Sequence, residues 1–139
     1  MEWMLMPYRR YADFAGRSRR MEYWMFALFQ FIVSIVLIGI LFGGAPTVDE
    51  YGVANEGPGT LFFVGIALLV FYGLASIIPS LAVAVRRLHD QDKSGWWLLL
   101  QFVPFGGLVL LIFMFLDGTP GPNRFGPDPK GREDTNVFS

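Results

Sequence analysis

The chain has 139 residues, enough for one small domain, and 53% of them are hydrophobic while only 17% are charged. Its net charge of −1 gives no sign of a nucleic-acid partner. The sequence has no cysteine, which excludes disulfides, thiol catalysis and thiolate metal sites, and its single histidine argues against structural zinc. We therefore expect neither a metal nor a cofactor.

Residues 1–22 predict an amphipathic lead-in that lies at a membrane interface. Gly16 is expected to end a short helix there. A basic cluster, Arg17, Arg19 and Arg20, then precedes Trp24, as expected where a helix enters a membrane from its positive side. The residues expected to share one face of the short helix are Tyr8, Tyr11, Ala12 and Ala15.

Three apolar stretches, 23–43, 60–85 and 96–116, contain no Asp, Glu, Lys, Arg or His. The first and third have 21 residues, and a helix of that length is roughly 31 Å long, close to the ~30 Å hydrocarbon core of a bilayer. The first exceeds the apolar core of a signal peptide, about 7–15 residues, so we expect it to be retained. The sequence predicts a single all-α membrane domain with three transmembrane helices.

The first span carries two features typical of helix packing. Gln30 and Ser34 are four residues apart, so they share a face that we expect to turn toward another helix. Gly39 and Gly43 form a G-x-x-x-G pattern that permits close approach of a helix, including one from a second copy of the chain. Because the pattern sits at the helix end, a loosened terminus is the favoured interpretation.

The second span contains Pro79, which predicts a kink because proline lacks an N–H and clashes with the preceding turn. Arg86 and Arg87 close this span, where cations suit a helix C-terminus.

The third stretch begins with a tight turn at Ser94-Gly95, where Ser94 or Asp92 is expected to cap a helix. Trp96 is expected at interface depth. Pro104–Gly107 is a breaking signal in the middle of this stretch.

Lys and Arg number five before the first span, none in the loop 44–59, three in the second loop and three in the tail 117–139. Three crossings with a cytoplasmic N-terminus place eight of these cations inside, which the positive-inside rule favours. A re-entrant hairpin at Pro104–Gly107 would place all 11 inside, but each arm would be only about 12 Å long and the turn would need partners for its amides. Three crossings, with the Gly/Pro-rich tail outside, are therefore the prediction.

Three motifs in order carry a resemblance to a known family. The first opens the first span: Phe14-x-Gly16-Arg17-x-x-Arg20-x-x-Tyr23-Trp24. The second precedes the last span: Arg86-Arg87-Leu88-His89-Asp90-x-x-Lys93-Ser94-Gly95-Trp96-Trp97. The third lies in the tail: Gly118-x-x-Gly121-x-Asn123-Arg124-Phe125-Gly126-x-Asp128-Pro129.

From about Tyr11 to Pro129 the chain resembles the domain-of-unknown-function 805 family of small bacterial inner-membrane proteins. The resemblance implies a helical fold in the inner membrane and no established activity. The longer, acidic loop at 44–59 departs from the family pattern, which leaves the role of that loop open.

The segment Arg86–Asp90 is the sharpest candidate site. Two arginines can hold a phosphate bidentately, and His89 beside Asp90 can shuttle a proton near neutral pH. The alternative is a charged turn that orients the second span. No nucleophile sits at a recognisable spacing, so we predict no catalytic residue and slightly favour contact with an anionic headgroup, with Arg17 and Arg20 converging on the same site.

The tail predicts a folded cap, because Asn and Asp beside Pro and Gly favour bonds from side chain to backbone. Phe125 would anchor this cap, and the alternative is a disordered tail whose end, from Lys130, is mobile. The residues that predict the cap are Asn123, Arg124, Gly126 and Asp128.

These features favour a non-enzymatic accessory protein that contacts membrane lipid, a second copy of itself or another membrane protein. A small oligomeric transporter is the alternative, because Pro79 and Pro104–Gly107 break the spans, although no ionisable residue lies within a span. An enzyme acting on a lipid-linked substrate ranks last.

Overall fold

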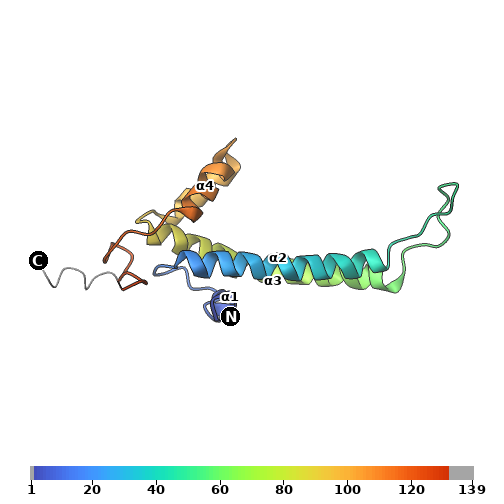
Figure 1. Ribbon diagram of the computed structural model, residues 1–139, viewed down its shortest axis with the longest axis horizontal. Helices are drawn as coiled ribbons and strands as arrows, with labels where there is room; N and C mark the ends of the chain where they lie inside the picture. The colour runs from blue at the N-terminus through green and yellow to red at the C-terminus, as the bar shows by residue number, and fades with distance from the viewer. Residues whose placement is uncertain (1, 132–139) are drawn as a thin grey trace, which may run out of the picture. The chain divides into compact units, whose positions relative to one another are not determined.

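The computed structural model describes residues 2–131 and is built from helices (Figure 1). Among these residues there is no β-strand, only isolated bridges at Val48–Ala54 and Asn123–Gly126, so the predicted all-α class is confirmed. The end of the predicted tail, residues 132–139, lies outside the described part of the chain. The helices are α1 (Glu2–Arg9), α2 (Arg20–Gly43), α3 (Thr60–Asp90), the 3-10 helix η1 (Gly95–Phe102) and α4 (Gly106–Phe115).

The chain divides into two compact units. One comprises the residues up to Ala27 together with those from Ile78 onward, and the other is Leu28–Ile77. All of the motif residues from Phe14 to Trp24 and from Arg86 onward belong to the first unit.

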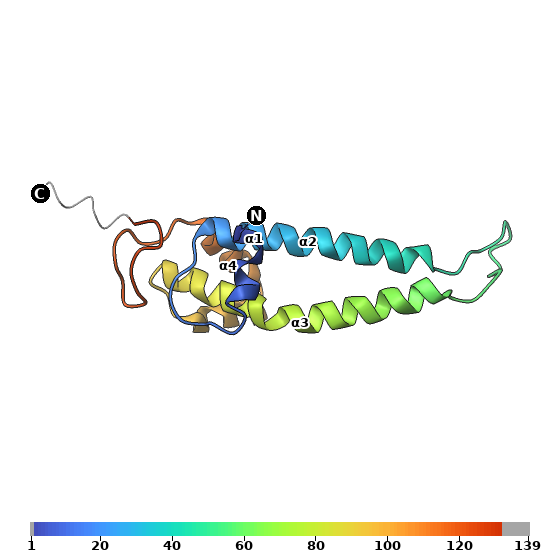
Figure 2. The same cartoon turned by 90° about the horizontal axis from the view of Figure 1, so that it is seen from below.

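In Leu28–Ile77, the second half of α2 and the first half of α3 lie side by side and antiparallel (Figure 2). Gly65 permits the close approach, because a Cβ built there would lie 2.6 Å from the Leu41 Cα. The Tyr72 hydroxyl donates a hydrogen bond to the Gln30 side-chain oxygen, so the prediction that Gln30 faces a helix is confirmed.

The G-x-x-x-G pattern does not make this helix contact. A Cβ at Gly39 would meet nothing within 4 Å, and one at Gly43 would make only an ordinary contact with Leu61. Gly44 is the tight position instead, because a Cβ there would lie 2.0 Å from the Phe62 nitrogen. Association of two copies through Gly39 stays a prediction.

Helices α2 and α3 are long and apolar enough to cross a membrane. Only 6% of the most apolar 18-residue stretch of α2, and 11% of that of α3, is buried by protein, unlike a core helix of a soluble protein. Large side chains such as Phe31 and Phe71 are 62% and 74% exposed. Such surfaces need a non-aqueous solvent.

The prediction of one continuous helix over 96–116 is wrong. The chain forms η1, turns at Val103–Phe105 and returns as α4, which packs against η1. Pro104 interrupts the helix and Phe105 takes a left-handed conformation, φ 63°, at the turn. The Gly106 amide donates a hydrogen bond to the Val103 carbonyl at 2.8 Å across the turn, and the shape is that of the re-entrant alternative.

Two smaller expectations are corrected in the first unit. Helix α1 ends at Arg9, so Tyr11, Ala12 and Ala15 do not share a helical face with Tyr8, whose ring packs on Phe26 at 5.3 Å. Helix α3 continues through the buried Pro79 and five residues beyond Val85, so Arg86–Asp90 is helical and not part of a loop. The predicted Ser94 cap is confirmed, because its hydroxyl accepts a bond from the Trp96 amide.

Candidate functional site

The end of α3 carries Arg86, whose side chain is completely buried. Its guanidinium binds the Glu22 carboxylate at 2.9 Å and the Ser18 hydroxyl at 3.0 Å. The Arg86 carbonyl accepts a bond from the Ser18 amide at 3.1 Å. One arginine therefore ties the segment before α2, and the first turn of α2, to the last turns of α3.

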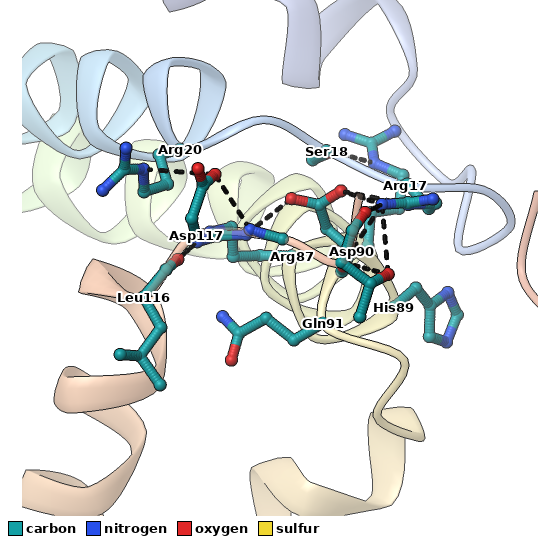
Figure 3. Close-up of polar contacts among 12 residues, drawn as sticks. Arg17, Ser18, Arg20, Arg87, His89, Asp90, Gln91, Leu116 and Asp117 are labelled. Atoms are coloured by element: carbon teal, nitrogen blue, oxygen red, sulfur yellow. Dashed lines mark hydrogen bonds and ion pairs between the residues drawn. The ribbon is translucent and has the colours of Figure 1, made fainter. Parts of the chain in front are cut away.

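Asp90 is the centre of a second set of ion pairs (Figure 3). One carboxylate oxygen accepts from Arg17 at 3.0 Å and the other from Arg87 at 2.8 Å, and all three side chains are at most 1% exposed. Gly118 leaves the space for this carboxylate, because a Cβ there would lie 2.0 Å from an Asp90 oxygen. We call Arg17, Glu22, Arg86, Arg87 and Asp90 the arginine clamp.

The tail folds over the end of α3 through Arg17, Thr119 and Asn123. Arg17 donates to the carbonyls of Thr119 at 2.5 Å and Gly121 at 2.7 Å. The Thr119 amide and the Asn123 side chain donate to the carbonyls of Asp90 and His89, at 2.7 and 2.9 Å. These bonds satisfy carbonyls that the end of a helix leaves without partners, so the tail lies as a cap on the end of α3.

His89 and Asp128 also serve this cap. The His89 ring stacks on Phe125 with centroids 3.9 Å apart, and its Nδ1 lies 3.0 Å from the Gly16 carbonyl. The Asp128 carboxylate accepts from the Gly121 amide at 3.1 Å and from the Lys130 amide at 2.9 Å. His89 therefore contacts Gly16 and Phe125, while the neighbouring Asp90 carboxylate points to two arginines.

Four side chains donate hydrogen bonds to the last carbonyls of the hairpin formed by η1 and α4. Trp24 donates to the Met114 carbonyl and Arg20 to the Phe115 carbonyl, both at 3.1 Å. Gln91 donates to the Phe113 carbonyl, and Arg87 to the Leu116 carbonyl. The hairpin is thus fastened to the start of α2 and the end of α3, and these carbonyl groups have hydrogen-bond partners within the protein.

This arrangement differs from the predicted headgroup site. The sequence correctly indicates that Arg17 and the Arg86–Asp90 segment converge, but their guanidinium groups point to internal carboxylates and carbonyls. Among the described residues, one buried side-chain nitrogen, the Arg87 Nε, has no hydrogen-bond partner. Two carboxylates and several backbone carbonyls accept hydrogen bonds from the three buried guanidinium groups, and the clamp therefore acts on structure.

Several predicted residues lie away from the clamp. Arg124 is exposed and pairs with Asp92 at 3.2 Å, and Gly95 packs against Val85. Trp96 is 79% exposed, and Pro79 is buried elsewhere in α3. Gly39 and Gly43 belong to the other unit.

The sequence interpretation missed Ser18, Glu22, Gln91 and Thr119. Glu22 carries a signal in hindsight, because it is the single acidic residue in the first turn of α2, between a basic cluster and an apolar span. The other three are small or neutral polar residues, and nothing in their local pattern indicates partners 22 to 102 residues away.

Exposed charges surround the clamp at Arg20, Asp117 and Lys130 (Figure 3 shows Arg20 and Asp117). Asp117 binds Lys130 at 2.5 Å and lies 3.7 Å from Arg20. The hydrogen bond from Lys130 holds the pKa of Asp117 below its usual value, so this carboxylate is ionised at neutral pH.

Within residues 2–131 no group of three His, Cys, Asp or Glu side chains is placed to hold a metal ion.

The chain is similar to a family of unknown function and to two relatives that are named inner membrane proteins. The family described as "Protein of unknown function (DUF805)" matches residues 11–127. Inner membrane protein YhaI of Escherichia coli K12 is 44% identical over 131 residues, which cover 94% of this chain and 97% of YhaI. Inner membrane protein YhaH of the same strain is 43% identical, over 94% of this chain and 98% of YhaH.

A more distant relative, uncharacterized protein YiiR of the same strain, is 25% identical over 84% of this chain and 85% of YiiR. No solved structure matches the chain. The names of YhaI and YhaH, together with the two long apolar helices, place the protein in the bacterial inner membrane. The chain belongs to the DUF805 family of proteins of unknown function.

Proposed function

We propose that the protein is a non-enzymatic accessory protein of the inner membrane, which contacts anionic lipid or a membrane partner through a basic cytoplasmic face. One observation carries this proposal: the polar residues of the three motifs bind one another. Asp90 accepts from two arginines, and His89 stacks on Phe125. The charged residues that a catalytic site would need are thus occupied in holding the fold together. The exposed cations around the arginine clamp can contact lipid or a partner.

The topology that we propose has α2 and α3 crossing the membrane and η1–α4 re-entering it. The tail contacts Arg17 and the end of α3, so it shares a side with the N-terminal segment. All 11 Lys and Arg residues precede the apolar part of α2 or follow Val85, while the loop 44–59 has none. The positive-inside rule then assigns both termini to the cytoplasm.

A reporter fused after Ser139 is expected to score as cytoplasmic, and one inserted at the exposed Gly52 as periplasmic. Alkaline phosphatase, active only outside, and a fluorescent protein that matures only inside give opposite readings. Phosphatase activity at the C-terminal fusion would contradict the hairpin topology and restore three crossings.

The basic face is expected to favour anionic phospholipid. Protein purified in mild detergent and mixed with equal amounts of phosphatidylglycerol and phosphatidylcholine should retain the former in excess, measured by native mass spectrometry. Raising NaCl should weaken the preference, because juxtamembrane cations contribute about 1 kcal/mol each and salt screens them. Equal retention of the two lipids would contradict the lipid part of the proposal and leave a protein partner.

A further inference from the structure

Two adjoining hollows lie where α2 begins. The first, about 260 Å³, is lined by Arg19, Arg20, Met21 and Lys130, and we call it the basic hollow. The second, about 300 Å³, is lined by Arg20, Met21, Trp24, Met25 and Phe115, and we call it the apolar groove. Because Arg20 and Met21 line both, the basic hollow and the apolar groove are direct neighbours.

The floor of the apolar groove is held in place by neighbouring contacts. The Trp24 and Phe115 rings pack with centroids 4.4 Å apart and planes 30° apart. The Trp24 indole also donates to the Met114 carbonyl at 3.1 Å. The groove therefore lies between α2 and the end of α4, with rings that have little freedom to close it.

The cations of the basic hollow are accessible, whereas those of the arginine clamp are buried. The lining of the hollow includes three cations, Arg19, Arg20 and Lys130. Asp117 pairs with Arg20 and Lys130, while Arg19 lies over the Trp3 ring at 5.3 Å. The Arg20 side chain is 45% exposed and that of Lys130 22%, whereas those of Arg86 and Arg87 are 0% exposed. The hollow thus has an excess of positive charge that an anion can reach.

The basic hollow and the apolar groove follow one another along α2 as the headgroups and the acyl chains do in a bilayer. Arg20 is the first residue of α2, and Met25 lies about 7.5 Å further along the helix, toward the hydrocarbon. Positive charge at headgroup level, followed by an apolar groove at acyl-chain level, complements an amphiphilic anion.

We propose that this composite site binds one anionic phospholipid, with its phosphate in the basic hollow and an acyl chain along the apolar groove. The site gives a location to the lipid contact in the proposed function and rests on it. Arginine and lysine bind the phosphate oxygens, and the Trp24–Phe115 floor packs on the chain.

The test measures phosphatidylglycerol retention by native mass spectrometry for wild type, three test variants and two control variants. Arg20→Gln/Lys130→Gln is expected to weaken retention roughly 30-fold, since each juxtamembrane cation changes affinity about fivefold. Met25→Trp fills the apolar groove and should weaken it as well. Lys130→Gln alone should weaken retention about fivefold. Because the Lys130 side chain bonds to Asp117 rather than to a hairpin carbonyl, this variant tests the site even if the double variant misfolds.

Two control variants make the same kinds of substitution outside the composite site. Lys93→Gln/Arg124→Gln deletes two other cations of the first unit, and Leu108→Trp enlarges an exposed residue of α4. Both should change retention less than twofold. Equal losses in the two double variants would overturn the composite site and leave a diffuse basic face, which the proposed function allows.

Unchanged retention in Met25→Trp would overturn the acyl-chain part of the site. Retention of no anionic lipid by wild type would overturn the site as a whole. A second copy of the chain in the apolar groove would instead appear as a dimer that Met25→Trp dissociates, which would also contradict the proposal.

Discussion

Replacing Asp90 with alanine is expected to destabilise the folded protein by about 3–5 kcal/mol, a large part of the stability of a small domain. The substitution leaves Arg17 and Arg87 buried, without the carboxylate that accepts a hydrogen bond from each, at 3.0 and 2.8 Å. An uncompensated buried charge costs far more than the loss of an exposed pair. The measurement is the free energy of unfolding in a titration of mild detergent with sodium dodecyl sulfate.

Arg124→Gln is the matched control, because it breaks the exposed pair with Asp92, whose side chains are 61% and 45% exposed. Its effect should stay within about 1 kcal/mol. Similar stabilities of Asp90→Ala and Arg124→Gln would show that the arginine clamp does not hold the fold. A double variant, Asp90→Ala/Arg17→Met, should recover part of the loss, since one orphaned charge is removed.

Replacing Gly106 with alanine should open the hairpin. A Cβ at this position would lie 1.6 Å from the Leu100 carbonyl oxygen and 2.6 Å from its carbonyl carbon, so the backbone of η1 or α4 must move. Overpacking of this kind costs about 1–3 kcal/mol and sometimes more. Loss of stability in the same detergent titration, with increased protease cleavage near residues 103–106, is the expected result.

Gly107 supplies the control for this change. A Cβ at Gly107 meets nothing within 4 Å, and alanine is about 1 kcal/mol more favourable than glycine inside a helix. Gly107→Ala should therefore leave the protein as stable as wild type or slightly more so. If both substitutions behaved alike, η1 and α4 would not pack as described.

Much of the fold follows from local pattern. Charge-free apolar stretches give the positions of α2 and α3 to within a few residues, and the Ser94 cap follows from a serine before an apolar run. The prediction for residues 96–116 fails because composition alone cannot distinguish one 21-residue helix from two short helices that turn back. The deciding features are Pro104, the left-handed Phe105 and the fit of Gly106 on Leu100, and the last is a packing contact between η1 and α4.

The candidate site divides in the same way. Arginine clusters beside apolar spans indicate that charged residues come together, and in the structure Arg17 does lie against the Arg86–Asp90 segment. The identity of the partners is a different matter, since Arg17 meets Asp90 across 73 positions and Arg86 meets Glu22 across 64. Long-range pairing decides whether a guanidinium group faces a ligand or a carboxylate, and single-residue patterns do not carry that information.

The fastening of the hairpin implies an order of assembly. The carbonyls at the end of α4 depend on Trp24, Arg20, Gln91 and Arg87, all of which leave the ribosome before α4 does. In the re-entrant topology that we propose, lipid supplies no substitute for these donors, so α4 would enter the bilayer only against α2 and α3 already in place. Under this topology, the packing of α4 completes the insertion that α2 and α3 begin.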